Sequence, residues 1–128
     1  MILDSSAIIA LLLREPAHEG LLDAIAGAPV AGVGAPTITE TGIVLNARIG
    51  AAGRTLLTRF LDESGVLPVS YEGEHARVAI DAFGRFGKGR HPASLNFGDC
   101  MTYATAKLAG RPLLCVGEDF AKTDLELV

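Results

Sequence analysis

The sequence predicts a three-layer α/β/α fold, with a central, mostly parallel sheet covered by helices on both faces. Short apolar stretches alternate with longer helical patterns along the chain, which is the order that gives a parallel sheet. Hydrophobic residues make up 49% of the chain and charged residues 20%, a composition typical of a globular protein. The length of 128 residues is that of one ordinary domain. We therefore expect residues 1–128 to form a single domain.

The first half of the chain opens with a short strand and a helix. Met1 to Leu3 is apolar and is followed by Asp4-Ser5-Ser6, residues typical of a helix N-cap. The first helix is expected from Ala7 to Leu13, because Glu15-Pro16 stops it. The next expected elements are a helix from Ala17 to Ala26, a strand within Pro29 to Gly34, a helix from Pro36 to Ile49, a break at Gly50 to Gly53 and a helix from Thr55 to Glu63.

The second half continues the alternation. Val66 to Tyr71 is typical of an edge strand, since its proline removes a hydrogen-bond donor. His75 to Phe86 has helical periodicity. The remaining expected elements are a polar, Gly-rich connection from Gly84 to Gly98, a helix from Asp99 to Ala109 closed by Gly110, and a strand from Pro112 to Val116.

Several classes of protein are excluded by composition. The longest apolar run, Ala7 to Leu13, is far shorter than the ~20 residues that cross a bilayer. The N-terminus has neither the basic region nor the cleavage site of a secretory signal. Cys100 and Cys115 fit a reducing compartment better than a disulfide or a zinc site. We therefore expect a cytoplasmic protein with no membrane association.

Acidic residues stand at the boundaries of four predicted elements. Asp4 closes the first strand, Glu40 and Asp99 lie near helix starts, and Glu118-Asp119 follows the last strand. Such positions meet at the carboxyl edge of a parallel sheet, where ligands bind. Clustered carboxylates repel one another unless a cation neutralises them, and Mg²⁺ or Mn²⁺ suits an all-oxygen site. Each acid also has an ordinary interpretation as a helix cap, an exposed turn or a solvated helix residue.

A basic segment precedes Asp99. Arg85, Lys88 and Arg90 occur between Gly84 and Gly98 without any acid, so the segment can guide a nucleic-acid backbone, and Phe86 or Phe97 can stack a base. A flexible loop with solvated charges is an equally good interpretation. The net charge of −4 argues mildly against nucleic acid. Setting four acids aside as metal ligands leaves eleven, which balance the eleven Lys and Arg.

Four short motifs, in order and across almost the whole chain, resemble those of PIN domains, and specifically the VapC-type toxin ribonucleases of bacterial toxin–antitoxin pairs. They are Met1-Ile2-Leu3-Asp4-Ser5-Ser6-Ala7, Thr39-Glu40, Leu95-Asn96-Phe97-Gly98-Asp99-Cys100 and Leu113-Leu114-Cys115-Val116-Gly117-Glu118-Asp119-Phe120. There is one departure, because many relatives carry an acid where this chain has Gly117. The fourth carboxylate is then Asp119 or Glu118.

The resemblance implies a magnesium-dependent endoribonuclease, with Mn²⁺ as a possible substitute. It implies that Asp4 and Asp99 bind the metal directly, and that Glu40 and Asp119 do so directly or through water. It also implies an RNA substrate, a homodimer and a cognate VapB-type antitoxin. The alternative is a catalytically degenerate PIN-fold protein that acts only as a protein-binding module, and Gly117 is the feature that favours it.

An interface is also indicated by the N-terminal helices. These Ala- and Leu-rich helices have more apolar positions than one small core needs, and such a surplus is typical of a protein–protein interface.

Overall fold

Four short parallel strands form the centre of the computed structural model, which describes residues 1–128. The strands are β1 (Ile2–Leu3), β2 (Gly32–Gly34), β3 (Leu67–Val69) and β4 (Leu113–Leu114), in the order β3-β2-β1-β4. The predicted parallel sheet is confirmed, and Pro68 lies on an edge strand as expected. The strands are shorter than the predicted apolar stretches. Val116, for example, lies outside β4 and donates its N–H to the side chain of Ser6 instead of to a neighbouring strand.

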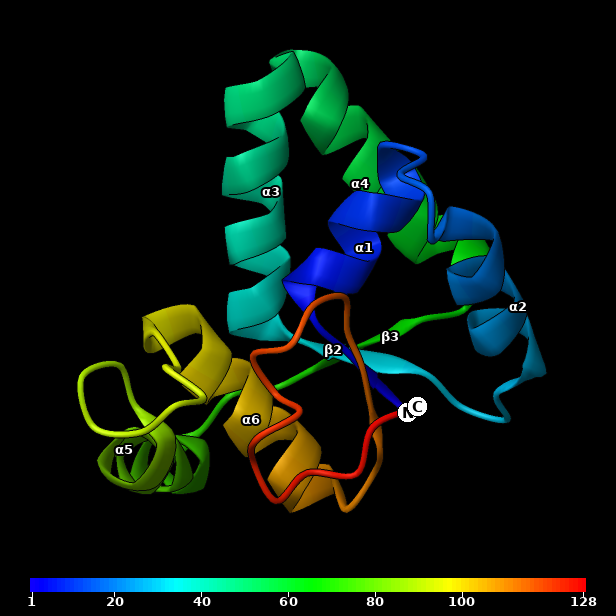
Figure 1. Cartoon of the computed structure of the whole chain (residues 1–128). Helices are drawn as coiled ribbons and strands as arrows, with labels where there is room; N and C mark the ends of the chain where they lie inside the picture. The colour runs from blue at the N-terminus through cyan, green and yellow to red at the C-terminus, as the bar shows by residue number, and fades with distance from the viewer.

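Six helices connect the strands and cover both faces of the sheet. They are α1 (Ser5–Leu12), α2 (His18–Gly27), α3 (Ala35–Ile49), α4 (Ala51–Ser64), α5 (Gly73–Phe86) and α6 (Phe97–Ala109). Figure 1 shows α1, α3 and α4 above the strands and α5 and α6 below them. The three-layer architecture is therefore confirmed.

The two faces of the sheet have separate cores, because successive strand residues point to opposite sides. Leu3 and Leu114 belong to the cluster that contains the buried residues of α1, α2 and α4. Ile2 and Leu113 belong to the cluster that contains those of α5 and α6. The sheet is therefore buried on both sides.

The junction between α3 and α4 differs from the prediction. Only Gly50, in the left-handed region at φ +67°, separates the two helices, whereas Gly53 lies inside α4 and is buried. A Cβ at Gly53 would lie 2.6 Å from the carbonyl carbon of Leu45 and 2.7 Å from its oxygen. The predicted break at Gly50 to Gly53 is therefore wrong, and Gly53 instead allows two antiparallel helices to touch.

The Gly-rich connection is also shorter than predicted. Helix α5 continues to Phe86, and the next residues fold back so that Gly87 bridges Leu95. Lys88 donates its backbone N–H to Leu95 O, and Leu95 donates its own to Phe86 O. The segment is thus closed by hydrogen bonds before α6 begins.

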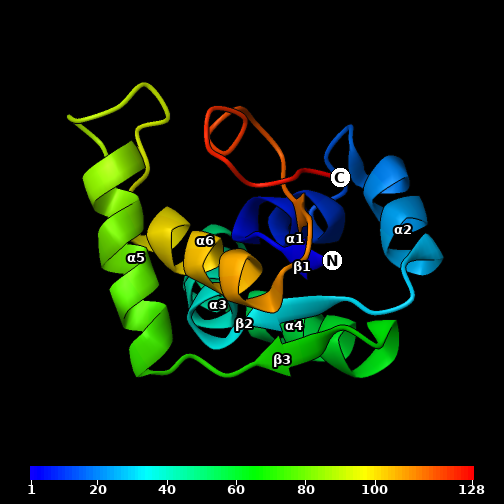
Figure 2. The ribbon, with the colours of Figure 1, turned by 90° about the horizontal axis from the view of Figure 1, so that it is seen from below.

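The C-terminal segment, residues 115–128, leaves β4 as a loop and returns to it (Figure 2). Leu127 bridges Leu113, and Val128 donates its N–H to Leu113 O. None of the helices combines the length and the apolar character needed to span a membrane.

Candidate metal centre

Four carboxylates come from four elements at the carboxyl edge of the sheet. Asp4 directly follows β1, Glu40 lies in the second turn of α3, Asp99 is the third residue of α6, and Asp119 lies in the segment after β4. Because the strands are all parallel, the chain leaves each of them at the same edge.

Asp4 is the most deeply placed of the four acids, with only 5% of its surface exposed. Its Oδ2 accepts the backbone N–H of Ser6 at 3.0 Å and the Ser6 hydroxyl at 2.6 Å, so Asp4 is also the N-cap of α1. Its Oδ1 accepts the hydroxyl of Thr102 at 3.0 Å. The capping and the cluster interpretations of Asp4 are therefore compatible.

Asp99 connects the four acids electrostatically. Burial raises its pKa to about 6; a backbone hydrogen bond from Asn96 opposes the shift, and the charges of Asp4, Asp119 and Glu40 add to it. Asn96 is the actual N-cap of α6, and Asp99 completes the capping box by accepting the N–H of Asn96 at 3.0 Å. None of the four acids forms an ion pair with Lys or Arg, so their negative charge is uncompensated within the chain.

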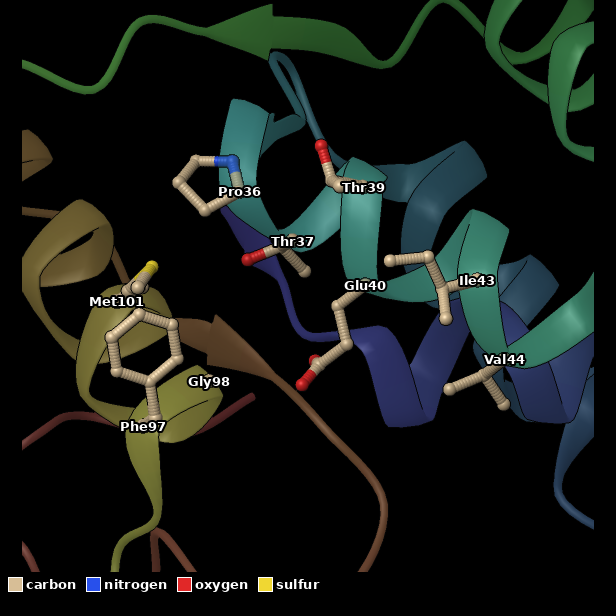
Figure 3. A pocket seen from close by; sticks show the side chains of 9 residues that line it. All are labelled: Pro36, Thr37, Thr39, Glu40, Ile43, Val44, Phe97, Gly98 and Met101. Carbon is tan, nitrogen blue, oxygen red and sulfur yellow. The ribbon is translucent and has the colours of Figure 1, made fainter.

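Glu40 reaches the cluster through a gap left by a glycine. A hollow of about 360 Å³ between α3 and α6 is lined by Glu40, Phe97, Gly98 and six neighbours (Figure 3). A Cβ at Gly98 would overlap Oε2 of Glu40 and lie 2.9 Å from its Cδ. The Glu40 carboxylate therefore rests against the first turn of α6, where the positive end of the helix dipole stabilises negative charge.

Asp119 contributes to the electrostatic environment of Asp99, whereas Glu118 does not. Asp119 is among the charges that raise the pKa of Asp99, and Glu118 is not. Gly117 has φ +96°, a conformation that glycine adopts without strain. Burial raises the pKa of the nearby Cys115 thiol to about 11, with added contributions from Asp4, Asp119 and Glu118.

The donor chemistry of this cluster fits a hard divalent cation, since all four side chains offer carboxylate oxygens. No three His, Cys, Asp or Glu side chains are already arranged around one point as a metal ion needs. Asp99 Oδ2 is instead turned back toward Asn96. The fit therefore rests on the oxygen donors and on the uncompensated charge.

The basic residues of the neighbouring segment have different environments. Arg85 pairs with Asp124 at 3.3 Å and stacks over Phe86, and Arg90 lies over the ring of Phe83. Lys88 forms no ion pair. Phe86 is buried, so the expectation that it stacks a base is wrong, whereas Phe97 is 80% exposed at the rim of the hollow.

Two threonines near the acids were not anticipated from the sequence. Thr37 and Thr102 are buried, and their hydroxyl oxygens lie 3.0 Å apart. Each stands three residues from a predicted acid, Glu40 or Asp99, on the same helix. This i, i+3 spacing places them on the same helical face as the acids, and it is the signal that would have identified them.

Comparison with known proteins finds a matching family model and similar sequences that cover nearly the whole chain. The PIN domain family model matches residues 1–126. The ribonuclease VapC36 of Mycobacterium tuberculosis is 52% identical over 127 residues, which is 98% of this chain and 91% of the relative. The ribonuclease VapC of Mycolicibacterium smegmatis is 42% identical over 128 residues, which is 100% of this chain and 99% of the relative.

Solved structures show the same fold at low identity. Mycobacterium tuberculosis VapC20, described as a toxin that cleaves the sarcin-ricin loop, has a TM-score of 0.81 at 18% identity and covers 99% of this chain and 97% of its own. VapBC2 from Rickettsia felis, bound to a DNA fragment from its promoter, has a TM-score of 0.77 at 12% identity, with coverage of 99% and 96%.

Proposed function

The chain belongs to the PIN domain family, and from this premise we propose that it is a metal-dependent endoribonuclease, the VapC-type toxin of a toxin–antitoxin pair. The relatives that carry this proposal are named ribonucleases and match nearly the whole chain. The observation in the structure that supports it best is the group of Asp4, Glu40, Asp99 and Asp119: burial raises the pKa of Asp99 to about 6, and the charges of the other three acids add to the shift. Uncompensated carboxylates of this kind are what a divalent cation requires.

We assign Mg²⁺ as the physiological metal, with Mn²⁺ as a substitute. Asp4 and Asp99 would hold it directly, and Glu40 and Asp119 would complete the site directly or through water. When bound, the cation supplies Lewis acidity and makes water a better nucleophile toward a phosphodiester. The protein residues orient the site: Ser6 and Thr102 fix the carboxylate of Asp4.

The RNA substrate would lie over the hollow between α3 and α6. Phe97 is exposed beside Glu40, and an exposed aromatic ring can stack a base. Lys88 lies just before α6 and forms no ion pair, so it is free to contact a phosphate. Arg85 already binds Asp124, and we therefore give it a smaller role than Lys88.

The decisive experiment uses Asp99→Asn. The amide can still accept the N–H of Asn96, so the capping box and the fold should remain. We expect RNA cleavage by the purified, antitoxin-free protein in Mg²⁺ to fall at least a thousandfold, as expected for loss of a metal ligand. Asp62→Asn, on the exposed surface of α4, is the control and should cleave normally. Full activity of Asp99→Asn would remove Asp99 from the mechanism.

A homodimer and a VapB-type antitoxin are the proposed partners. One solved relative is the toxin–antitoxin complex from Klebsiella pneumoniae, with a TM-score of 0.72. Exposed apolar surface is available in this chain: Ile80 and Phe83 border a hollow of about 470 Å³ between α5 and α6 whose lining is entirely apolar. Light scattering of the wild type and of Ile80→Glu would test the dimer, and only the variant should be monomeric.

A degenerate binding module remains the competing function. It predicts that Mg²⁺ does not change the melting temperature, whereas a metal-dependent nuclease is stabilised by mass action. The charge of Asp119, which adds to the raised pKa of Asp99, supports the nuclease, because Asp119 would then supply the acid that Gly117 lacks.

A further inference from the structure

A chain of buried hydroxyl groups lies beneath the acidic cluster. The Thr102 hydroxyl donates to Asp4 Oδ1, and the Thr37 and Thr102 oxygens are 3.0 Å apart. A hydroxyl has one proton. Because Thr102 gives its proton to Asp4, Thr37 must donate to Thr102. The order Thr37 to Thr102 to Asp4 is therefore fixed in direction and ends on a carboxylate oxygen.

This hydroxyl chain connects the elements that carry three of the four acids. Thr102 lies one turn after Asp99 on α6, Thr37 lies one turn before Glu40 on α3, and Asp4 follows β1. In Figure 3 the Thr37 hydroxyl points toward α6, on the side where Glu40 also extends. The spacing of the acids and the hydroxyl chain therefore depend on the same helix contact.

The contact between α3 and α6 is buried and close. Thr37 is 3% exposed and Thr102 is 0% exposed, so water cannot replace a lost hydroxyl at little cost. Gly34, which precedes α3, lets α6 approach: a Cβ there would lie 2.7 Å from Thr105 Oγ1. Aligned hydrogen bonds in such an environment polarise and strengthen one another.

From this arrangement we propose that Thr102, supported by Thr37, is a positioning residue that fixes the orientation of the Asp4 carboxylate as a ligand of the proposed metal site. The inference rests on the proposed metal-dependent function. It goes beyond the four acids, since neither threonine is itself a ligand of the cation. Hydrogen bonds to metal-binding carboxylates typically change metal affinity by about 10- to 100-fold.

The test measures Mn²⁺ binding to the full chain by the loss of the free-ion signal in electron paramagnetic resonance, without RNA. Thr102→Val keeps the shape of the side chain and removes the hydroxyl, so Mn²⁺ affinity should fall about tenfold or more. Thr37→Val should give a smaller loss, because Thr102 can still donate to Asp4. Thr102→Ser restores the hydroxyl and should restore most of the affinity.

Thr105→Val is the matched control. Thr105 is buried on the same helix, but its hydroxyl donates to Met101 O instead of Asp4, so Mn²⁺ affinity should be unchanged. Equal affinity of the wild type and Thr102→Val would overturn the inference alone, as would equal losses in Thr102→Val and Thr105→Val. Absence of Mn²⁺ binding by the wild type would overturn the proposed metal site and this inference together.

Discussion

At the scale of single residues, the site combines two demands on the same side chains. Asp4 and Asp99 each accept hydrogen bonds at a helix start, and both also belong to a group of like charges. The first role stabilises the fold, whereas the second costs free energy until a cation binds. Asp99 shows the conflict most clearly, because its pKa is raised although Asn96 donates an N–H to it.

The pH dependence of stability should reveal this cost. The pKa of Asp99 is raised from 3.8 to about 6, so the folded state favours the protonated carboxyl. Its stabilising contribution is present below the unfolded pKa of about 4 and is lost as the pH rises through 6. In EDTA at pH 7.5, Asp99→Asn should therefore be more stable than the wild type, on the order of 1 kcal/mol after allowance for solvent screening.

Thermal melting at several pH values measures the effect. A difference of that size corresponds to about 3–5 °C in Tm for a chain of this length. The advantage of Asp99→Asn should shrink toward pH 4, and added Mg²⁺ should reverse it by stabilising only the wild type. A difference in Tm that is constant from pH 4 to 7.5 would contradict the electrostatic explanation.

Gly98→Ala tests the space that Glu40 occupies. The new Cβ would overlap the far end of a flexible side chain, so Glu40 can swing away and the fold should survive with little change in Tm. RNA cleavage should nevertheless fall at least tenfold, because Glu40 leaves the cluster. Gly84→Ala, which meets no atom within 4 Å, is the control for adding a methyl group and should keep full activity.

At the scale of helices and strands, local pattern predicted most of the fold. The alternation of apolar and helical segments predicted the parallel sheet, and the acids at element boundaries predicted a site at its carboxyl edge, which stays a prediction. The predicted break at Gly50 to Gly53 was too long because glycine has low helix propensity. Gly53 nevertheless lies inside α4, where the lack of a side chain allows close contact with the backbone of Leu45. Thr37 and Thr102 were missed because their i, i+3 spacing from Glu40 and Asp99 was not considered, and a threonine buried between two helices has no distinctive local pattern.

Gly53→Ala is the matching prediction at this scale. Its Cβ would meet the backbone of Leu45 at 2.6 Å, which cannot rotate away as a side chain can. The helices α3 and α4 must separate, at a cost of about 1–3 kcal/mol, although alanine has the higher helix propensity. Urea unfolding of the purified variant measures this, and a stabilised Gly53→Ala would show that propensity outweighs the contact.

At the scale of the whole molecule, Asp124 links the C-terminal segment to α5 and α6 by hydrogen bonds, beside the packing of Phe120 against the same helices. Asp124 accepts the Tyr103 hydroxyl at 2.7 Å, the Lys107 ammonium at 2.9 Å and the Arg85 guanidinium at 3.3 Å. Because Asp119 lies on the same segment, this attachment also limits the movement of the fourth acid. The segment between β4 and the C-terminus is thus held at Asp124, at the buried Phe120 and at the bridge between Leu113 and Leu127.

The hydrogen bond from Lys107, joined by that from Tyr103 and by the charges of Lys107 and Arg85, lowers the pKa of Asp124 to about 2 against an opposing effect of burial. A depressed pKa contributes stability above the unfolded value of about 4, and the contribution is lost as the pH falls toward 2.

Asp124→Asn should therefore be less stable than the wild type at pH 7, by about 1 kcal/mol because the group is largely solvent-screened, and the difference should vanish near pH 2. Denaturant unfolding at both pH values measures this, with the exposed Glu126→Gln as control. Hydrogen exchange near residue 124 should also accelerate in Asp124→Asn, because the hydrogen bonds that Asp124 makes to α5 and α6 are weakened there. Unchanged exchange there would show that the buried Phe120 and the bridge to Leu113 hold the segment without Asp124.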